Sequence, residues 1–230
     1  MIVTIDGPAG AGKSTTAREL ASRLAFQFLD TGAMYRAVTW LCLRQGIDLD
    51  DERAVAASAR RGDFRFQGGQ VFVDGHDVTR EIRRSAVTND TRFIAANNEV
   101  RAFLVELQRE LAVGANVVTE GRDQGTVAFP HAECKFFLTA SPLKRALRRQ
   151  QDLAQNGEQV PIEDILAQQE GRDQRDAMRE YGALKPAPDA IPIDTSELDF
   201  EQVVARMEQI VRSRSGFPAS RLNVTFGTED

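Results

Sequence analysis

Lysine is scarce in this chain, and that scarcity is the first informative feature of its composition. Only four of the 29 basic residues are lysines, and the rest are arginines. Arginine presents a rigid, planar fork of donors that matches phosphate and carboxylate groups better than the compact charge of lysine does. A GC-rich genome would produce the same bias, so the positions of the arginines, and not their number, bear on function.

Cysteine is almost absent as well. Cys42 and Cys134 both lie in apolar runs, and the sequence has neither a CxxC pair nor the spacing of a metal-ligand cluster. Two buried thiols in a chain of this size predict a reduced compartment, so we expect a cytoplasmic protein. The sequence also lacks the ~18-residue apolar run of a membrane span and the pattern of a signal peptide, which predicts no membrane partner.

Positive charge is not in excess. The 34 acidic residues outnumber the 29 basic ones, which gives a net charge of −5. An acidic chain is a poor candidate for bulk nucleic-acid binding, so we expect no nucleic-acid partner. Hydrophobic residues make up 42% and charged residues 27% of the chain, which excludes a disordered protein. A length of 230 residues suits one domain with an insertion.

Short apolar runs alternate with helical stripes along the chain. The runs predict strands at residues 2–5, 26–29, 117–119, 134–139 and 191–194, and the stripes predict helices at residues 17–24, 34–43, 51–61, 100–111 and 200–211. This alternation is typical of an α/β fold with a parallel sheet and helices on both faces. Ligands of such sheets bind beyond the carboxyl ends of the strands.

The alternation is interrupted at one place by a different pattern, and it ends after Arg214. Around residues 64–73 apolar residues recur with period two across a Gly-Gly turn, which predicts a β-hairpin within an inserted subdomain over residues 63–94. Ser141 and Pro142 form a helix-start signal, with an N-cap followed by proline at the first helical position. After Arg214 the periodicity stops, so residues 215–230 are expected to form a disordered tail.

The most specific motif follows the first predicted strand. Residues 7–14 match G-x-x-x-x-G-K-[ST], a loop whose backbone N–H groups cradle phosphates in front of a helix N-terminus. Lys13 would reach the β- and γ-phosphates of a nucleotide, and the Ser14 hydroxyl would ligate Mg²⁺. The predicted phosphate-binding residues are Gly7, Pro8, Ala9, Gly10, Ala11, Gly12, Lys13, Ser14 and Thr15.

Polar residues follow two further strands. Thr31 is predicted to be the N-cap of a helix that carries Arg36 one turn further on. Arg122 and Asp123 follow the strand at 117–119, and Glu120 could orient Mg²⁺ through water. Taken alone, each of these patterns also fits an ordinary capped helix or a structural carboxylate.

Arginine clusters flank a loop at residues 155–157 between two predicted helical stretches. They comprise Arg145, Arg148 and Arg149 on one side and Arg172, Arg175 and Arg179 on the other. Such an arrangement suits a lid that closes arginines over transferring phosphates. A solvated helix face with i, i+4 ion pairs is the alternative interpretation.

Joined in order, these segments resemble the bacterial cytidylate kinases. The resemblance runs from about residue 1 to residue 212 and rests on the sequences IDGPAGAGKST (5–15), LDTGAMYR (29–36), GRDQGT (121–126) and DTS (194–196). The second and third are its most specific parts. The resemblance implies a P-loop kinase fold in a single kinase domain over residues 1–214. An inserted nucleoside-monophosphate-binding subdomain would lie at about 33–95 and a helical lid at about 150–182.

The resemblance also implies an activity, namely transfer of the γ-phosphate of ATP to CMP or dCMP by a monomer that uses Mg²⁺. It implies that Lys13, Arg172 and Arg179 act on the transferring phosphate, with Arg36 and Arg122 at the acceptor phosphate. It places Thr31 near the base, and Arg101 and Asp123 at the cytosine edge. Arg172 and Asp176 would approach the sugar. A guanidinium and a carboxylate do complement the acceptor oxygen and donor amine of cytosine.

Three residues depart from the family pattern. Gln124 replaces an apolar residue after the Gly-Arg-Asp stretch, and Ala183 replaces a proline that often follows the lid. Arg92 stands where the family usually has a small serine that touches the base.

Two kinds of alternative remain at this point. A kinase for another monophosphate, such as UMP or AMP, would use the same loop and lid. A nucleotide switch of the GTPase type would normally carry Asn-Lys-x-Asp, which this sequence does not contain. A degenerate kinase that only binds nucleotides is disfavoured by the intact Gly12, Lys13 and Ser14.

Overall fold

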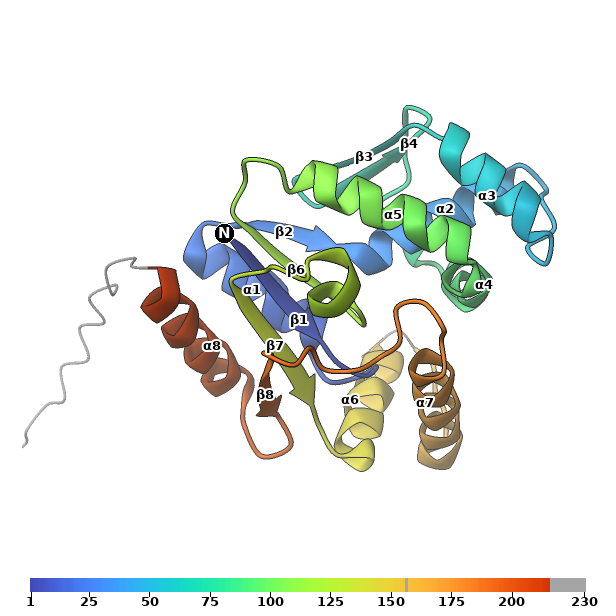
Figure 1. Cartoon of the computed structure of the whole chain (residues 1–230). Coiled ribbons are helices and arrows are strands. Elements are labelled where there is room, and N and C mark those ends of the chain that lie inside the picture. Colours follow the sequence, from blue (N-terminus) through green and yellow to red (C-terminus); the bar gives the residue numbers. More distant parts are fainter. Residues whose placement is uncertain (156, 216–230) are drawn as a thin grey trace, which may run out of the picture.

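The computed structural model describes residues 1–155 and 157–215. A five-stranded sheet in the order β2-β6-β1-β7-β8 lies at its centre (Figure 1). Its strands are β1 (Ile2–Asp6), β2 (Gln27–Asp30), β6 (Val117–Gly121), β7 (Cys134–Thr139) and β8 (Ile191–Asp194). All neighbouring strands pair in parallel, which confirms the predicted α/β fold class.

The register of the sheet brings the strand ends together. Asp6 at the end of β1 is paired with Gly121 of β6, and Asp30 at the end of β2 is paired with Glu120. The three polar segments predicted to follow strands therefore share one edge of the sheet, as parallel pairing requires.

Helices cover both faces of the sheet (Figure 1). One face packs against α1 (Lys13–Leu24) and α8 (Phe200–Ser215), whose apolar stripes meet Ile5 and Phe136 in one core cluster. On the other face, α2 (Thr31–Arg44), α3 (Glu52–Arg61) and α5 (Asn98–Leu111) contribute to a second cluster that includes Val117. The predicted helical periodicities thus bury their apolar faces in these two clusters, where α3 packs on α2 and α5 and not on the sheet itself.

The interruption at residues 63–94 forms a small antiparallel sheet. It contains β3 (Phe64–Gln67), β4 (Gln70–Val73) and β5 (His76–Asp77), followed by the 3₁₀ turn η1 (Glu81–Arg83) and the helix α4 (Ser85–Ala96). The hairpin is confirmed. The sequence did not predict β5, because two exposed polar residues carry no alternation.

The inserted segment is anchored to α2. Val71, Val73 and Ile82 pack with α2 in a third core cluster. Trp40 on α2 donates its indole N–H to a carboxylate oxygen of Glu81 in η1 at 2.7 Å. Apolar burial and one directed hydrogen bond therefore fix η1 beside the second helix.

A helix pair, α6 (Pro142–Gln155) and α7 (Ile162–Ala177), follows β7. The Ser141 hydroxyl oxygen accepts from the Lys144 N–H at 3.3 Å, which confirms the predicted helix start. Residues 178–190, which we call the strap, then run over the carboxyl edge of the sheet to reach β8 (Figure 1).

A π-helical segment, η2 (Gln124–Ala128), follows β6 and was missed by the sequence patterns. The carboxylate of Asp6 accepts from the N–H groups of Gln124 and Gly125 at 2.8 and 2.7 Å. Asp6 is buried, and burial raises its pKa from 3.8 to about 6. A side chain at the end of β1 thus holds the start of η2.

Cys42 and Cys134 are free thiols and fully buried, as expected. Within the described ranges, none of the helices has the length and apolar character to cross a bilayer. The expected tail lies outside the described residues from position 216 onward.

The raised pKa of Asp6 predicts a pH dependence of stability. The folded chain holds this proton more tightly than the unfolded chain, so the stabilisation is complete below pH about 4 and is lost as the pH rises through about 6. Relative to Asp6→Asn, which cannot titrate, the wild type should lose about 2–3 kcal/mol of unfolding free energy over that window. Urea unfolding at several pH values measures this difference. Parallel pH profiles for the two proteins would contradict it.

Candidate functional site

The predicted phosphate loop connects β1 to α1 at the carboxyl edge of the sheet. Gly12 caps α1, whose first residues are Lys13 and Ser14, so the loop delivers a helix N-terminus to any bound anion. Gly7 has φ +147°, and a Cβ there would lie 2.0 Å from the carbonyl oxygen of Leu138 in β7. Only glycine fits this approach, which seats the loop on the sheet.

Lys13 is buried beneath this loop. Its ammonium donates to the carbonyl oxygen of Pro8 at 2.8 Å. Burial, together with the charge of Arg122, lowers the pKa of Lys13 to about 7, although Glu120 acts in the opposite direction. A phosphate group placed here would give this ammonium a negatively charged partner.

Ser14 and Glu120 meet across the ends of α1 and β6. The Ser14 hydroxyl donates to Glu120 Oε1 at 3.0 Å, and Glu120 is buried. These oxygen donors fit Mg²⁺, which typically binds one or two protein oxygens together with substrate phosphates and water. Among the described residues no group of three His, Cys, Asp or Glu side chains could hold a metal by itself.

The prediction that Thr31 caps α2 is wrong. Asp30 is the cap, because its Oδ1 accepts from the Ala33 N–H at 2.8 Å. Thr31 already lies in the first turn, and its hydroxyl donates instead to the backbone carbonyl of Glu120 at 2.6 Å. It thereby links α2 to the end of β6 and stays buried at the site.

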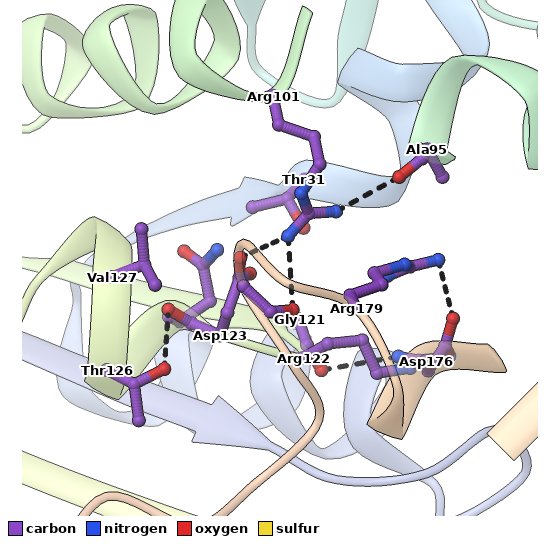
Figure 2. A network of polar contacts seen from close by, with 12 residues as sticks. Thr31, Ala95, Arg101, Gly121, Arg122, Asp123, Thr126, Val127, Asp176 and Arg179 are labelled. Atoms are coloured by element: carbon purple, nitrogen blue, oxygen red, sulfur yellow. Dashed lines mark hydrogen bonds and ion pairs between the residues drawn. The ribbon is translucent and has the colours of Figure 1, made fainter. Parts of the chain in front are cut away.

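Asp176 of α7 joins the helix pair to the sheet (Figure 2). Its Oδ2 accepts from Arg122 Nε at 2.8 Å, and its Oδ1 pairs with Arg179 Nη2 at 2.6 Å. Asp176 is buried, so both bonds form away from bulk water, where charge-assisted contacts are strong. The structure therefore gathers the predicted residues Arg122, Asp176 and Arg179 into one network.

Arg101 and Asp123 form a buried ion pair (Figure 2). Arg101 comes from α5 and also donates to the carbonyl oxygens of Ala95 and Gly182, at 3.3 and 3.2 Å. Its buried Nε has no hydrogen-bond partner within the described part of the chain. The pair thus has an unused donor at the position where the sequence predicts base recognition.

The remaining predicted arginines divide into two groups. Arg36 is half-buried and lies 3.5 Å from Asp30, and Arg172 is exposed on α7. By contrast, Arg145 donates to the carbonyl oxygen of Ala9 at 2.9 Å, and Arg148 donates to Thr195. Those two arginines of α6 hold the helix against the phosphate loop and the end of β8.

The structure explains one of the three departures from the family pattern and shows where a second side chain lies. Gln124 is buried, and its amide oxygen accepts from the Thr119 hydroxyl at 2.8 Å, so the polar side chain is paired. Arg92 is exposed and lies 4.8 Å from the ring of Phe93, its neighbour on α4. Nothing in the structure explains Ala183.

Sequence reasoning missed several residues of the site. Asp173 accepts from the Ala9 N–H at 3.3 Å and pairs with Arg145 at 2.6 Å, so α7 touches the phosphate loop directly. The rings of Tyr35 and Tyr181 each lie 5.9 Å from the Arg101 guanidinium carbon. Asp173 lies within an arginine cluster that the sequence pattern identified, but no sequence pattern indicated a role for Tyr181 in the strap.

A glycine loop that feeds the first strand into a helix N-terminus, under a helix pair that supplies arginines, is the construction of a P-loop kinase. Comparison of the sequence with known protein families narrows this class of kinases to one family. Residues 3–213 match the family model for cytidylate kinase, and the chain belongs to that family.

Individual relatives agree with the family model. A cytidylate kinase from Rhodopirellula baltica is 48% identical over 212 residues, which cover 92% of this chain and 93% of that protein. A cytidylate kinase from Caldanaerobacter subterraneus is 45% identical, with 93% and 95% of the two chains covered. A solved structure of an uncharacterized protein from Eubacterium ventriosum shares the fold, with TM-score 0.54 and 12% identity over 93% of this chain and 99% of that one.

Gly182 offers a matched test of how closely the strap packs on the site. Gly182 and Gly114 have nearly equal φ, +69° and +70°, but a Cβ on Gly182 would lie 2.0 Å from both Arg101 and Asp123, whereas one on Gly114 meets nothing within 4 Å. Gly114→Ala should cost about 1–2 kcal/mol of unfolding free energy through left-handed strain. Gly182→Ala should cost about 1–3 kcal/mol more through overpacking. Equal losses in urea unfolding would contradict the close packing.

Proposed function

We propose that this chain transfers the γ-phosphate of ATP to CMP or dCMP, which gives ADP and CDP or dCDP. The observation that carries the proposal is the meeting of two sites at one sheet edge. The phosphate loop lies at the end of β1, and the Arg101–Asp123 pair lies beside the end of β6. Family membership supports the same reaction.

On the donor side, the phosphate loop would bind ATP. The residues proposed for this role are Gly7, Pro8, Ala9, Gly10, Ala11, Gly12, Lys13, Ser14 and Thr15. Mg²⁺, when bound, would neutralise charge between the β- and γ-phosphates, with Ser14 as its protein ligand and Glu120 beside it. The buried ammonium of Lys13 would contact the transferring phosphate and stabilise its charge.

On the acceptor side, guanidinium groups would bind the monophosphate. Arg36 and Arg122 are proposed for the CMP phosphate because Arg36 of α2 lies 3.5 Å from Asp30 at the end of β2, and Arg122 directly follows β6, with which β2 is paired. Arg101 and Asp123 would contact the cytosine edge, with Thr31 close to the base. Asp176 and Arg172 would approach the sugar from α7.

The chemistry requires little proton transfer by the protein. A phosphate monoester has its second pKa near about 6, so the attacking oxygen of CMP is already ionised at neutral pH. Catalysis then depends on holding the two nucleotides in line and on arginine charge around the transferring group. Arg172 and Arg179, which flank Asp176 on the helix pair and strap, are proposed to supply that charge.

The parts of the chain would divide this work within one kinase domain over residues 1–214. We propose that the insertion at about 33–95 covers the acceptor nucleotide and that the lid at about 150–182 covers the phosphates. The contacts of α7 with Ala9 and Arg122 support such a lid, because one helix touches both nucleotide sites. We propose that the kinase acts as a monomer.

A coupled assay with Mg-ATP tests the proposed function. The panel of acceptors is CMP, dCMP, UMP, AMP and GMP, each at matched concentration. We expect the highest kcat/KM on CMP or dCMP, because a carboxylate and a guanidinium together complement cytosine. Highest turnover on AMP or GMP would reject the proposal, and highest turnover on UMP would assign the enzyme to another pyrimidine monophosphate.

Lys13→Met tests the phosphate loop. Removing this ammonium should lower kcat/KM by a factor of about 10² or more, because a preorganised charge on the transferring phosphate is lost. The control is Lys144→Met on α6, whose side chain is 47% exposed and pairs with the exposed carboxylate of Glu197 at 3.7 Å. Circular dichroism checks that both variants fold. Turnover near the wild-type value in Lys13→Met would contradict the assigned role of the loop.

A further inference from the structure

Asp30, at the carboxyl end of β2, has more arginines around it than its charge can balance. Arg36 of α2 lies 3.5 Å from its carboxylate, Arg83 of η1 lies 3.3 Å away, and Arg18 of α1 lies 3.9 Å away. The three guanidinium groups come from three different elements, α1, α2 and η1, of which η1 follows the small antiparallel sheet. They converge on a single carboxylate that also caps α2.

These contacts leave a surplus of positive charge. One carboxylate faces three guanidinium groups, and Asp30 also accepts the Ala33 N–H. The buried Nε of Arg36 has no partner in the part of the chain that the structure describes. The N-terminus of α2 adds its partial positive charge at the same point. An anion with more charge than one carboxylate would complete this arrangement.

Arg83 is held loosely compared with the arginines of the Asp176 network. Its ion pair with Asp30 measures 3.3 Å, against 2.6 and 2.8 Å for the two pairs of Asp176. The Arg83 side chain is 47% exposed, so its remaining N–H groups face solvent or an incoming ligand. A long, half-exposed pair contributes little to stability and is readily exchanged for a stronger partner.

The location of Arg83 indicates which ligand would take it. Asp30 is paired in register with Glu120, which precedes Arg122 by two residues. Arg36, which shares Asp30 with Arg83, is already proposed for the acceptor phosphate. A dianionic phosphate bound between Arg36 and Arg122 would therefore lie close to the positive charge of Arg83 as well.

We propose that Arg83 is a further ligand of the acceptor phosphate, supplied by the inserted segment and held by Asp30 until the nucleotide arrives. The inference rests on the proposed function, and it extends the substrate-binding set to a residue of η1. A phosphate with a charge of about −1.5 to −2 draws Arg83 from the single charge of Asp30. The inserted segment then bonds to the substrate itself, through the phosphate and not through the base.

The competing interpretation is that the Arg83–Asp30 pair only ties the inserted segment to the core. Both interpretations predict some loss of function when Arg83 is removed. They differ in which part of the substrate is affected, because a structural tie would alter the contacts of the phosphate and of the base together.

Binding of CMP and of cytidine, measured by calorimetry without ATP, separates the two interpretations. Arg83→Ala should weaken CMP binding by about 10- to 100-fold, as the loss of a charge-assisted contact to phosphate implies. Cytidine, which has no phosphate, should bind with unchanged affinity. The matched control is Arg84→Ala, an exposed arginine one position further on, which should leave both affinities unchanged.

Each other outcome overturns the proposal in a recognisable way. Unchanged CMP affinity in Arg83→Ala, or equal weakening of CMP and cytidine, overturns the role of Arg83 while the proposed function stands. A wild-type protein that does not bind CMP overturns the proposed function and this inference together. If Arg83→Ala does not fold, Arg83→Gln retains hydrogen-bond donors without the charge and is subject to the same comparison. A loss selective for CMP is again the expected result.

Discussion

The site depends on the parallel pairing of β1 with β6. This pairing places Asp6 opposite Gly121, and with it the phosphate loop beside Glu120 and Arg122. The polar groups of the proposed reaction lie close to strand ends on this edge or reach it from an adjoining helix or, for Arg179, from the strap. The hydrogen bonds from Ser14 and Thr31 to Glu120 then fix α1 and α2 to the end of β6. One register therefore aligns the proposed donor and acceptor sites.

Charge distribution is the second organising feature. The chain as a whole is acidic, but its arginines gather around a few buried or half-buried carboxylates at the sheet edge, among them Asp30, Asp123 and Asp176. In the absence of nucleotides these carboxylates keep the guanidinium groups ordered and limit their mutual repulsion. Other arginines have structural roles, and Arg145 and Arg148 hold α6 in place. The arginines at this edge of the sheet are the ones for which we propose functional roles, and composition suffices to explain the others.

The sequence predicted the parts of the fold that local periodicity encodes. The five strands, the hairpin at residues 64–73 and the start of α6 were all found by pattern, and the phosphate loop was found by its motif. Thr31 was mistaken for a cap because Asp30 and Thr31 are both good capping residues, and only the structure shows which carboxylate or hydroxyl reaches the Ala33 N–H. The π-helix at Gln124–Ala128 depends on a distant carboxylate, Asp6, which no local pattern reveals. The approach of Gly182 to Arg101 likewise depends on the path of the strap through space.

Trp40 gives the molecule an optical property of its own. It is the one tryptophan in the chain. It lies where α2 meets η1, and its indole N–H is hydrogen-bonded to Glu81 of η1. The guanidinium of Arg44 stacks over the same ring at 5.0 Å. Indole emission responds to hydrogen bonding and to nearby charge, so the intrinsic fluorescence of the unlabelled protein reports the position of η1 relative to α2. Movement of the inserted segment can therefore be followed in real time, without a dye and without altering the chain.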